Sequence, residues 1–127
     1  MYGLRGNCDN LVSEFVAARG EEERFYRHYV DVWRDRCLLV QMGHAAGFET
    51  RGPEELPALR EVVRARFGPE LAFLEAMPEI LLTPDYLFVH GGVADEAHLE
   101  GLDAWKCMKN DDFLSQGHSF RRWCIVG

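Results

Sequence analysis

The chain has 127 residues, of which 47% are hydrophobic, and a formal net charge of -7. This length and apolar content suffice for one domain with a buried core, and the acidic balance argues against a nucleic-acid surface. No apolar run approaches the roughly 20 residues that span a bilayer, and the start lacks a signal-peptide pattern. The composition therefore predicts a soluble, cytoplasmic protein with neither nucleic acid nor a membrane as its partner.

The four cysteines are far apart and include no Cys-x-x-Cys pair. This spacing favours reduced thiols over a zinc knuckle or a small disulfide scaffold. Cys37 and Cys124 stand among apolar residues, where a thiol packs as a small hydrophobic group. We therefore expect both of them in a core.

The first stretch with several potentially functional side chains close together is Leu4-Arg5-Gly6-Asn7-Cys8-Asp9-Asn10. It reads as the end of a strand, a tight turn at Gly6 and a helix start with Asn10 as the N-cap. Two interpretations are open: an Asx-type turn with a buried cysteine, or a site that combines an amide oxygen, a thiol and a carboxylate.

The next seventy residues show helical spacing of apolar side chains, and we expect a helical insert over about residues 11–78. Gly20, Gly68 and Pro78 punctuate it as helix stops or turns. The predicted helices are residues 11–19, 21 to about 42, about 57–67 and 69–77.

The remainder of the chain predicts strands. Residues 80–82 and 86–89 flank Thr83-Pro84-Asp85 as a hairpin that delivers His90 at the end of its second strand, before Gly91-Gly92. Residues 94–100 suggest a helical turn, and residues 105–112 read as a surface loop or as one wall of a substrate pocket. Residues 120–126 return to a strand, entered by Arg121-Arg122, which are either solvent-exposed or include one phosphate ligand.

Two stretches together resemble a known family. Gly6-Asn7-Cys8-Asp9 resembles the Gly-Asn-His-Asp/Glu motif of the calcineurin-like metallophosphoesterases, and Val89-His90-Gly91-Gly92 resembles their later metal-ligand motif. The lead-in Leu4-Arg5-Gly6-Asn7, followed later by His90-Gly91-Gly92, is closest to the Ser/Thr protein phosphatase-like branch. Residues 123–127 resemble the strand that leads into the Gly-His motif of that family.

The resemblance implies a phosphatase that hydrolyses phosphate esters with water activated by two divalent metal ions, manganese, iron or zinc. It assigns Asn7 and His90 as metal ligands and Cys8 and Asp9 as catalytic residues. Cys8 occupies the position of a histidine that donates a proton, and a thiol is a weaker donor than imidazolium. The implied substrate is a phosphoprotein, a nucleotide or a small phosphoester.

The implied fold is α/β: the helical insert and a few strands, a hairpin and a C-terminal strand, belong to a metallophosphatase-type β-sandwich flanked by helices. Only three residues precede Leu4, so the Asp-x-His and Gly-Asp-x-x-Asp-Arg strands of the family are missing. We therefore expect this chain to be truncated at both ends, inactive alone and prone to associate through an unpaired sheet edge.

Two other functions compete with this one. The chain could be a non-catalytic helical interaction domain, in which Asn7 and His90 are ordinary turn residues. It could also be a redox or zinc protein that uses Cys8, Cys107, His90 and His118.

Overall fold

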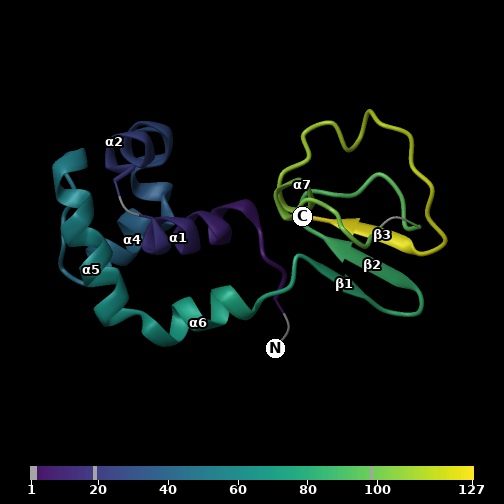
Figure 1. Cartoon of the computed structure of the whole chain (residues 1–127), viewed down its shortest axis with the longest axis horizontal. Helices are drawn as coiled ribbons and strands as arrows, with labels where there is room; N and C mark the ends of the chain where they lie inside the picture. Colours follow the sequence, from purple (N-terminus) through teal and green to yellow (C-terminus); the bar gives the residue numbers. More distant parts are fainter. Residues whose placement is uncertain (1–2, 19, 98) are drawn as a thin grey trace. The chain divides into compact units, whose positions relative to one another are not determined.

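The computed structural model describes residues 3–18, 20–97 and 99–127 and is mixed α/β, about half helical with a small three-stranded sheet. The chain divides into two compact units (Figure 1). The helical unit is Cys8–Glu75, and the sheet unit combines the residues up to Asn7 with Ala76–Gly127. None of the described helices is both long enough and apolar enough to cross a bilayer.

The helical unit contains most of the predicted insert. Its elements are α1 (Asn7–Ala17, which begins at the last residue of the sheet unit), α2 (Glu22–Phe25), the π-helical η1 (Tyr26–Val30), α3 (Asp31–Trp33), the 3-10 helix η2 (Arg34–Arg36), α4 (Leu38–Ala45), the 3-10 helix η3 (Pro53–Glu55), α5 (Leu56–Arg66) and α6 (Gly68–Ala76).

Helix α1 begins at Asn7, four residues earlier than expected. The first turn contains Asn7, Cys8 and Asp9, so the prediction of Asn10 as the N-cap is wrong. The Asn10 side chain instead donates a hydrogen bond to Glu14 at 2.7 Å, one turn along the helix surface. The predicted strand before Gly6 is also absent, since residues 3–6 have no regular structure. The predicted end of this helix, Arg19, lies outside the described residues.

The single helix expected over residues 21–42 is interrupted. Arg34 adopts a positive φ of 46°, and Cys37 is extended, with φ -70° and ψ 123°. The break leaves Trp33 half exposed, whereas Cys37 and Leu39 enter the core. The prediction was wrong because the helical spacing of apolar residues continues through the Arg34-Asp35-Arg36 cluster. The burial of side chains in the core, which this spacing does not specify, determines where the helix breaks.

One core holds the helical unit together. Cys37 belongs to it, as predicted, and burial raises the pKa of its thiol, so the thiol stays protonated. The fully buried side chains of this core come from α1, α4 and α5: Val12, Phe15, Leu39, Leu56, Leu59 and Val63.

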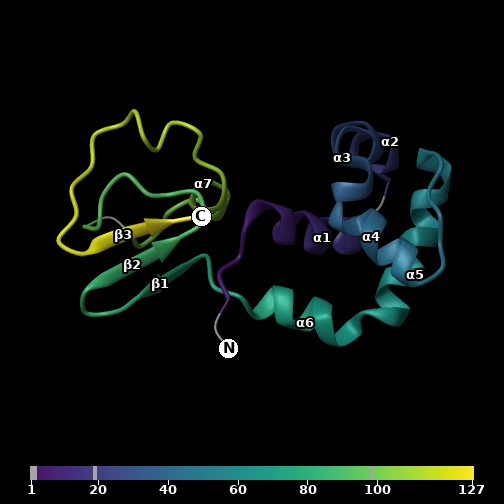
Figure 2. The same cartoon turned by 180° about the vertical axis from the view of Figure 1, so that it is seen from behind.

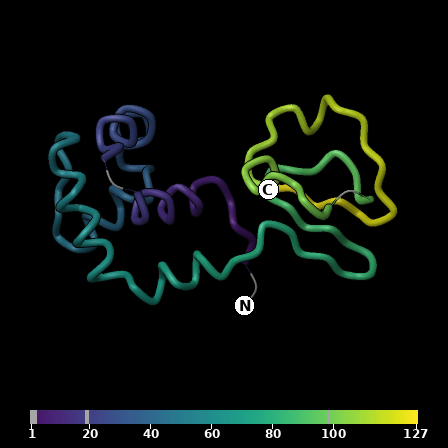
Figure 3. Tube along the Cα trace, viewed as in Figure 1, coloured from purple at the N-terminus to yellow at the C-terminus, as the bar shows by residue number. Residues whose placement is uncertain are grey.

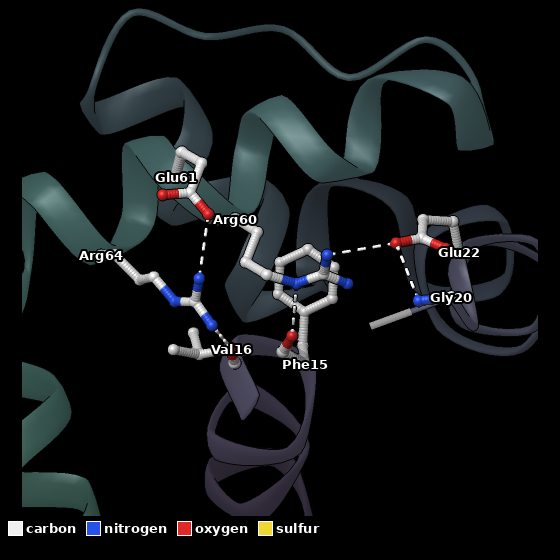
Figure 4. A network of polar contacts seen from close by, with 7 residues as sticks. All are labelled: Phe15, Val16, Gly20, Glu22, Arg60, Glu61 and Arg64. Carbon is white, nitrogen blue, oxygen red and sulfur yellow. Dashed lines mark hydrogen bonds and ion pairs between the residues drawn. The ribbon is translucent and has the colours of Figure 1, made fainter. Parts of the chain in front are cut away.

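A buried arginine ties α5 to the end of α1 (Figure 4). Arg60 is 5% exposed, donates from Nε to the Phe15 carbonyl at 2.8 Å and from Nη1 to Glu22 at 3.1 Å, and lies over the Phe15 ring. Arg64 donates to the Val16 carbonyl. These guanidinium groups satisfy carbonyls that the end of a helix otherwise leaves without partners.

The Glu22 carboxylate makes the stability of this unit depend on pH. Hydrogen bonds from its own backbone N–H and from Arg60 hold the pKa of Glu22 below its ordinary value of 4.5. A lowered folded-state pKa contributes stability above pH 4.5, which is lost as the pH falls through the folded value. We expect the wild type to lose more unfolding free energy than Glu22→Gln between pH 6 and 3, measured by urea denaturation. Parallel losses in both proteins would contradict this.

The sheet unit contains β1 (Ile80–Leu82), β2 (Tyr86–Val89), α7 (Ala104–Met108) and β3 (Trp123–Val126). The strand order is β1-β2-β3; β1 and β2 are the predicted hairpin, and β2 pairs with β3 in parallel (Figure 2). Residues 94–97 and 99–100 contain bends, turns and an isolated bridge from Asp95 to Ser119, so the predicted helical turn is wrong for them; His98 lies outside the described residues.

One sheet face packs on the sheet unit's own core and the other is open. Leu87, Val89 and Cys107 are buried, and Cys124 packs against them, as predicted. On the opposite face Trp123 is 74% exposed, and β3 forms an edge of the described sheet. This exposed apolar strand agrees with the expected sheet edge, whereas association of the chain stays a prediction.

Candidate functional site

The parallel pairing of β2 and β3 brings two chain segments to one edge of the sheet. Val89, the last residue of β2, pairs with Val126, the last residue of β3. The residues that follow them are also joined, because the Gly127 N–H donates a hydrogen bond to the His90 carbonyl at 3.1 Å. Ligands of α/β proteins commonly bind at the carboxyl ends of parallel strands. His90 therefore lies where this topology builds binding sites.

The lead-in to α1 reaches the same edge. The Arg5 N–H donates to the Pro78 carbonyl at 2.9 Å, so this segment runs beside the entry to β1, as the tube in Figure 3 shows. Asn7 follows and directs its side-chain oxygen at the imidazole: Asn7 Oδ1 and His90 Nε2 are 3.1 Å apart. The structure thus brings together the two residues that the resemblance assigns as metal ligands.

Gly127 makes room for the imidazole. A Cβ atom at this position would lie 3.0 Å from His90 Nδ1. That separation is tighter than ordinary van der Waals contact, so a larger residue would press on the ring. The glycine was recognised in the sequence only as the end of a strand, and its contact with His90 depends on the parallel pairing.

A hollow of about 310 Å³, here called the site pocket, opens beside Asn7 and His90. Its size lies at the lower end of the range of small-molecule sites. The other residues that line it are Gly91, Met108, Lys109, Asn110, Asp111, Phe113, Leu114, Val126 and Gly127.

The segment after α7 forms one wall of the site pocket. Of the two interpretations of residues 105–112, the pocket wall is therefore the one that the geometry supports for residues 108–111. Lys109 and Asp111 form an ion pair, and Asn110 Nδ2 donates to the Gly92 carbonyl at 3.3 Å. The wall thus presents one cation, one carboxylate and one amide to the pocket.

The wall stands close to the strand ends because Gly91 has no side chain. A Cβ atom at Gly91 would lie 2.6 Å from the backbone nitrogen of Lys109 and 2.7 Å from the carbonyl carbon of Met108. The Gly91 N–H also donates to the Cys107 carbonyl at 2.6 Å. Only glycine permits this approach of two backbones.

The predicted catalytic residues Cys8 and Asp9 belong to the helical unit. Both lie in the first turn of α1, directly after Asn7 in the chain, and Cys8 is exposed. The interpretation of Cys8 as a buried turn residue is therefore wrong. Asp9 is an acidic residue near the positive end of the helix dipole, a favourable place for a carboxylate.

The arginines before β3 do not line the site pocket. Arg122 forms an ion pair with Glu96 and donates from Nε to the Thr83 carbonyl at 2.7 Å. Its guanidinium group thus fastens the hairpin turn to the segment before β3. The Arg121 side chain is exposed, in line with one of the two interpretations.

The redox or zinc hypothesis finds little support in the positions of its residues. Cys107 is 2% exposed in the core of the sheet unit, and burial raises the pKa of its thiol, which disfavours the thiolate that binds metals or attacks disulfides. Within residues 3–18, 20–97 and 99–127, no three histidine, cysteine, aspartate or glutamate side chains cluster as a metal site.

Asn7 and His90 fit as two neighbouring ligands of one metal ion. Two donor atoms at about 2.1 Å from an octahedral ion lie about 3.0 Å apart, close to the 3.1 Å that separates Asn7 Oδ1 from His90 Nε2. Amide oxygen and imidazole nitrogen both suit borderline divalent cations. Among the described residues, no cluster of three or more histidine, cysteine, aspartate or glutamate side chains accompanies this pair.

No protein-family model matches the chain, and the comparisons with curated proteins and with solved structures each found no match.

Proposed function

We propose that this chain is part of a calcineurin-like metallophosphoesterase of the Ser/Thr protein phosphatase-like branch, with its sheet inside a metallophosphatase-type β-sandwich. One observation carries the proposal: Asn7 and His90, 83 residues apart, direct donor atoms at one another from 3.1 Å. The substrate of the complete, cytoplasmic enzyme is a phosphate ester.

Three side chains of the site pocket have a part in this proposal. Asn7 and His90 hold a divalent ion, manganese, iron or zinc, which when bound polarises a phosphoryl oxygen and lowers the pKa of a bound water. Lys109 supplies positive charge for the anionic substrate, and Gly91 keeps that lysine close to the strand ends. A second ion needs carboxylates beyond the described donor pair.

The metal site can be tested by calorimetric titration of the chain with MnCl₂. We expect His90→Ala to weaken manganese binding by about tenfold or more, since even partners of metal ligands change affinity by about 10–100-fold. His44→Ala is the matched control, because His44 is exposed on α4 in the helical unit. Equal affinities in all three proteins would contradict the site.

Cys8 is the proposed proton donor of the complete enzyme. Because this thiol is exposed, Cys8→Ser should leave folding nearly unchanged, so a fall in turnover would report on chemistry. We expect Cys8→Ser to lower turnover of an aryl phosphate and Cys8→His to preserve or raise it, because imidazolium is the better donor. Equal turnover in all three forms would exclude the donor role.

A second candidate is the non-catalytic helical interaction domain. The observation that favours it is an apolar groove of about 520 Å³ on the helical unit, lined by residues that include Leu38, Met42 and Phe73. Grooves of this kind accept amphipathic helices. If this were the function, Phe73→Ser would abolish the protein's activity in its cell and His90→Ala would not.

A further inference from the structure

The site pocket has an apolar side beside its polar one. Asn7, His90 and Lys109 provide the polar groups, whereas Phe113 and Leu114 provide an apolar surface in the same hollow. Pockets of this mixed kind orient a ligand through a few polar groups and bind its body through apolar contact. The shape and chemistry of the apolar side of the pocket therefore indicate which organic group of the ligand it can bind.

The ring of Phe113 is held in place. At Gly92, where φ is +90°, a Cβ atom would lie 2.2 Å from the Phe113 ring, so the ring packs directly on backbone. The Phe113 ring also lies 4.5 Å from the His118 ring, which stacks at 5.7 Å on Phe120. A ring fixed in this way offers a preformed apolar surface at little entropic cost.

Leu114 is an apolar side chain that is exposed to solvent. It is 89% exposed, in a turn closed by hydrogen bonds from the Phe113 N–H to the Asn110 carbonyl and from the Ser115 N–H to the Asp112 carbonyl. Covering such a side chain with an apolar group is favourable in proportion to the area removed from water. Leu114 and Phe113 are adjacent in the chain, so one apolar group can cover both.

We propose that the site pocket selects phosphoesters of aryl alcohols, with the phosphoryl group toward Asn7, His90 and Lys109 and the aromatic ring against Phe113 and Leu114. This inference rests on the proposed phosphoesterase function and specifies its substrate class. A free aryl phosphate and a phosphotyrosine side chain share this chemistry.

Binding of two non-hydrolysable probes to the chain tests the inference. Phenylphosphonate and methylphosphonate carry the same anion and differ in the ring, and their affinities can be measured by NMR titration of ¹⁵N-labelled protein. We expect phenylphosphonate to bind about fivefold tighter or more, as apolar burial of part of a ring predicts. A peptide that carries the phosphonate analogue of phosphotyrosine, bound tighter than phenylphosphonate, would indicate a protein source of the aryl group.

Leu114→Ser should reduce the preference for phenylphosphonate to less than about twofold, since it removes apolar surface without disturbing a buried contact. Leu82→Ser is the matched control, because Leu82 is also exposed in the sheet unit but lies outside the site pocket. Equal binding of both probes by the wild type, or an unchanged preference in Leu114→Ser, would overturn the aryl inference alone. Failure of both probes to bind would overturn the proposed phosphoester site together with it.

Discussion

Arg60→Ala is expected to lower the free energy of unfolding of the helical unit by about 3 kcal/mol, in the range found when one partner of a buried ion pair is removed. The substitution takes away the hydrogen bonds to the Phe15 carbonyl and to Glu22, and it empties the space over the Phe15 ring. Urea denaturation followed by far-ultraviolet circular dichroism measures the loss, because the helical unit provides most of the helical signal.

Two further variants separate the packing and the polar contacts of Arg60 as causes of this loss of stability. Arg60→Met keeps much of the buried aliphatic part of the side chain and should lower the free energy of unfolding less than Arg60→Ala. It also removes Arg60 Nη2, which is buried with no hydrogen-bond partner among the described residues. Arg66→Ala, at an exposed position on the same helix α5, should change stability by less than about 0.5 kcal/mol. A loss in Arg60→Ala no larger than in Arg66→Ala would show that the arginine does not tie α5 to α1.

Gly91→Ala is expected to destabilise the sheet unit by about 1–3 kcal/mol, the usual cost of overpacking, and to weaken manganese binding. The added methyl group would meet the backbone at Met108 and Lys109, which cannot move without shifting the wall of the site pocket. Amide hydrogen exchange in β2 and β3 measures the stability of this unit directly.

The matched control for this prediction is Gly117→Ala. A Cβ atom at Gly117 would have no atom within 4 Å, so this substitution should leave exchange and metal binding unchanged. Wild-type exchange rates and manganese affinity in Gly91→Ala would contradict the close approach of the two backbones.

Local signals predicted the elements whose ends carry proline or glycine. The helices predicted to start at about Pro57 and at Pro69 begin within one residue of those positions, and the hairpin around Pro84 has the predicted strands, because these residues restrict the backbone themselves. The break between Arg34 and Cys37 could not be predicted, since it depends on which distant side chains bury Cys37 and Leu39.

The candidate site was predicted in part. Asn7 and His90 were recognisable because each stands in a short motif of small residues, and the structure brings them together. Phe113 and Leu114 carry no periodic or turn signal, and Phe113 is placed by its contact with Gly92. Val126 and Gly127 reach the pocket through the parallel pairing of β2 with β3. Such pairing joins segments more than thirty residues apart, which no local pattern specifies.

The most direct test of the central claim is pulsed electron paramagnetic resonance of Mn²⁺ bound to the chain. If Asn7 and His90 hold the metal ion, the spectrum shows coupling to one imidazole nitrogen, and this coupling disappears in His90→Gln. The same coupling in His90→Gln, or its absence from the wild type, would contradict the assignment of His90 as a metal ligand and with it the proposed phosphoesterase site.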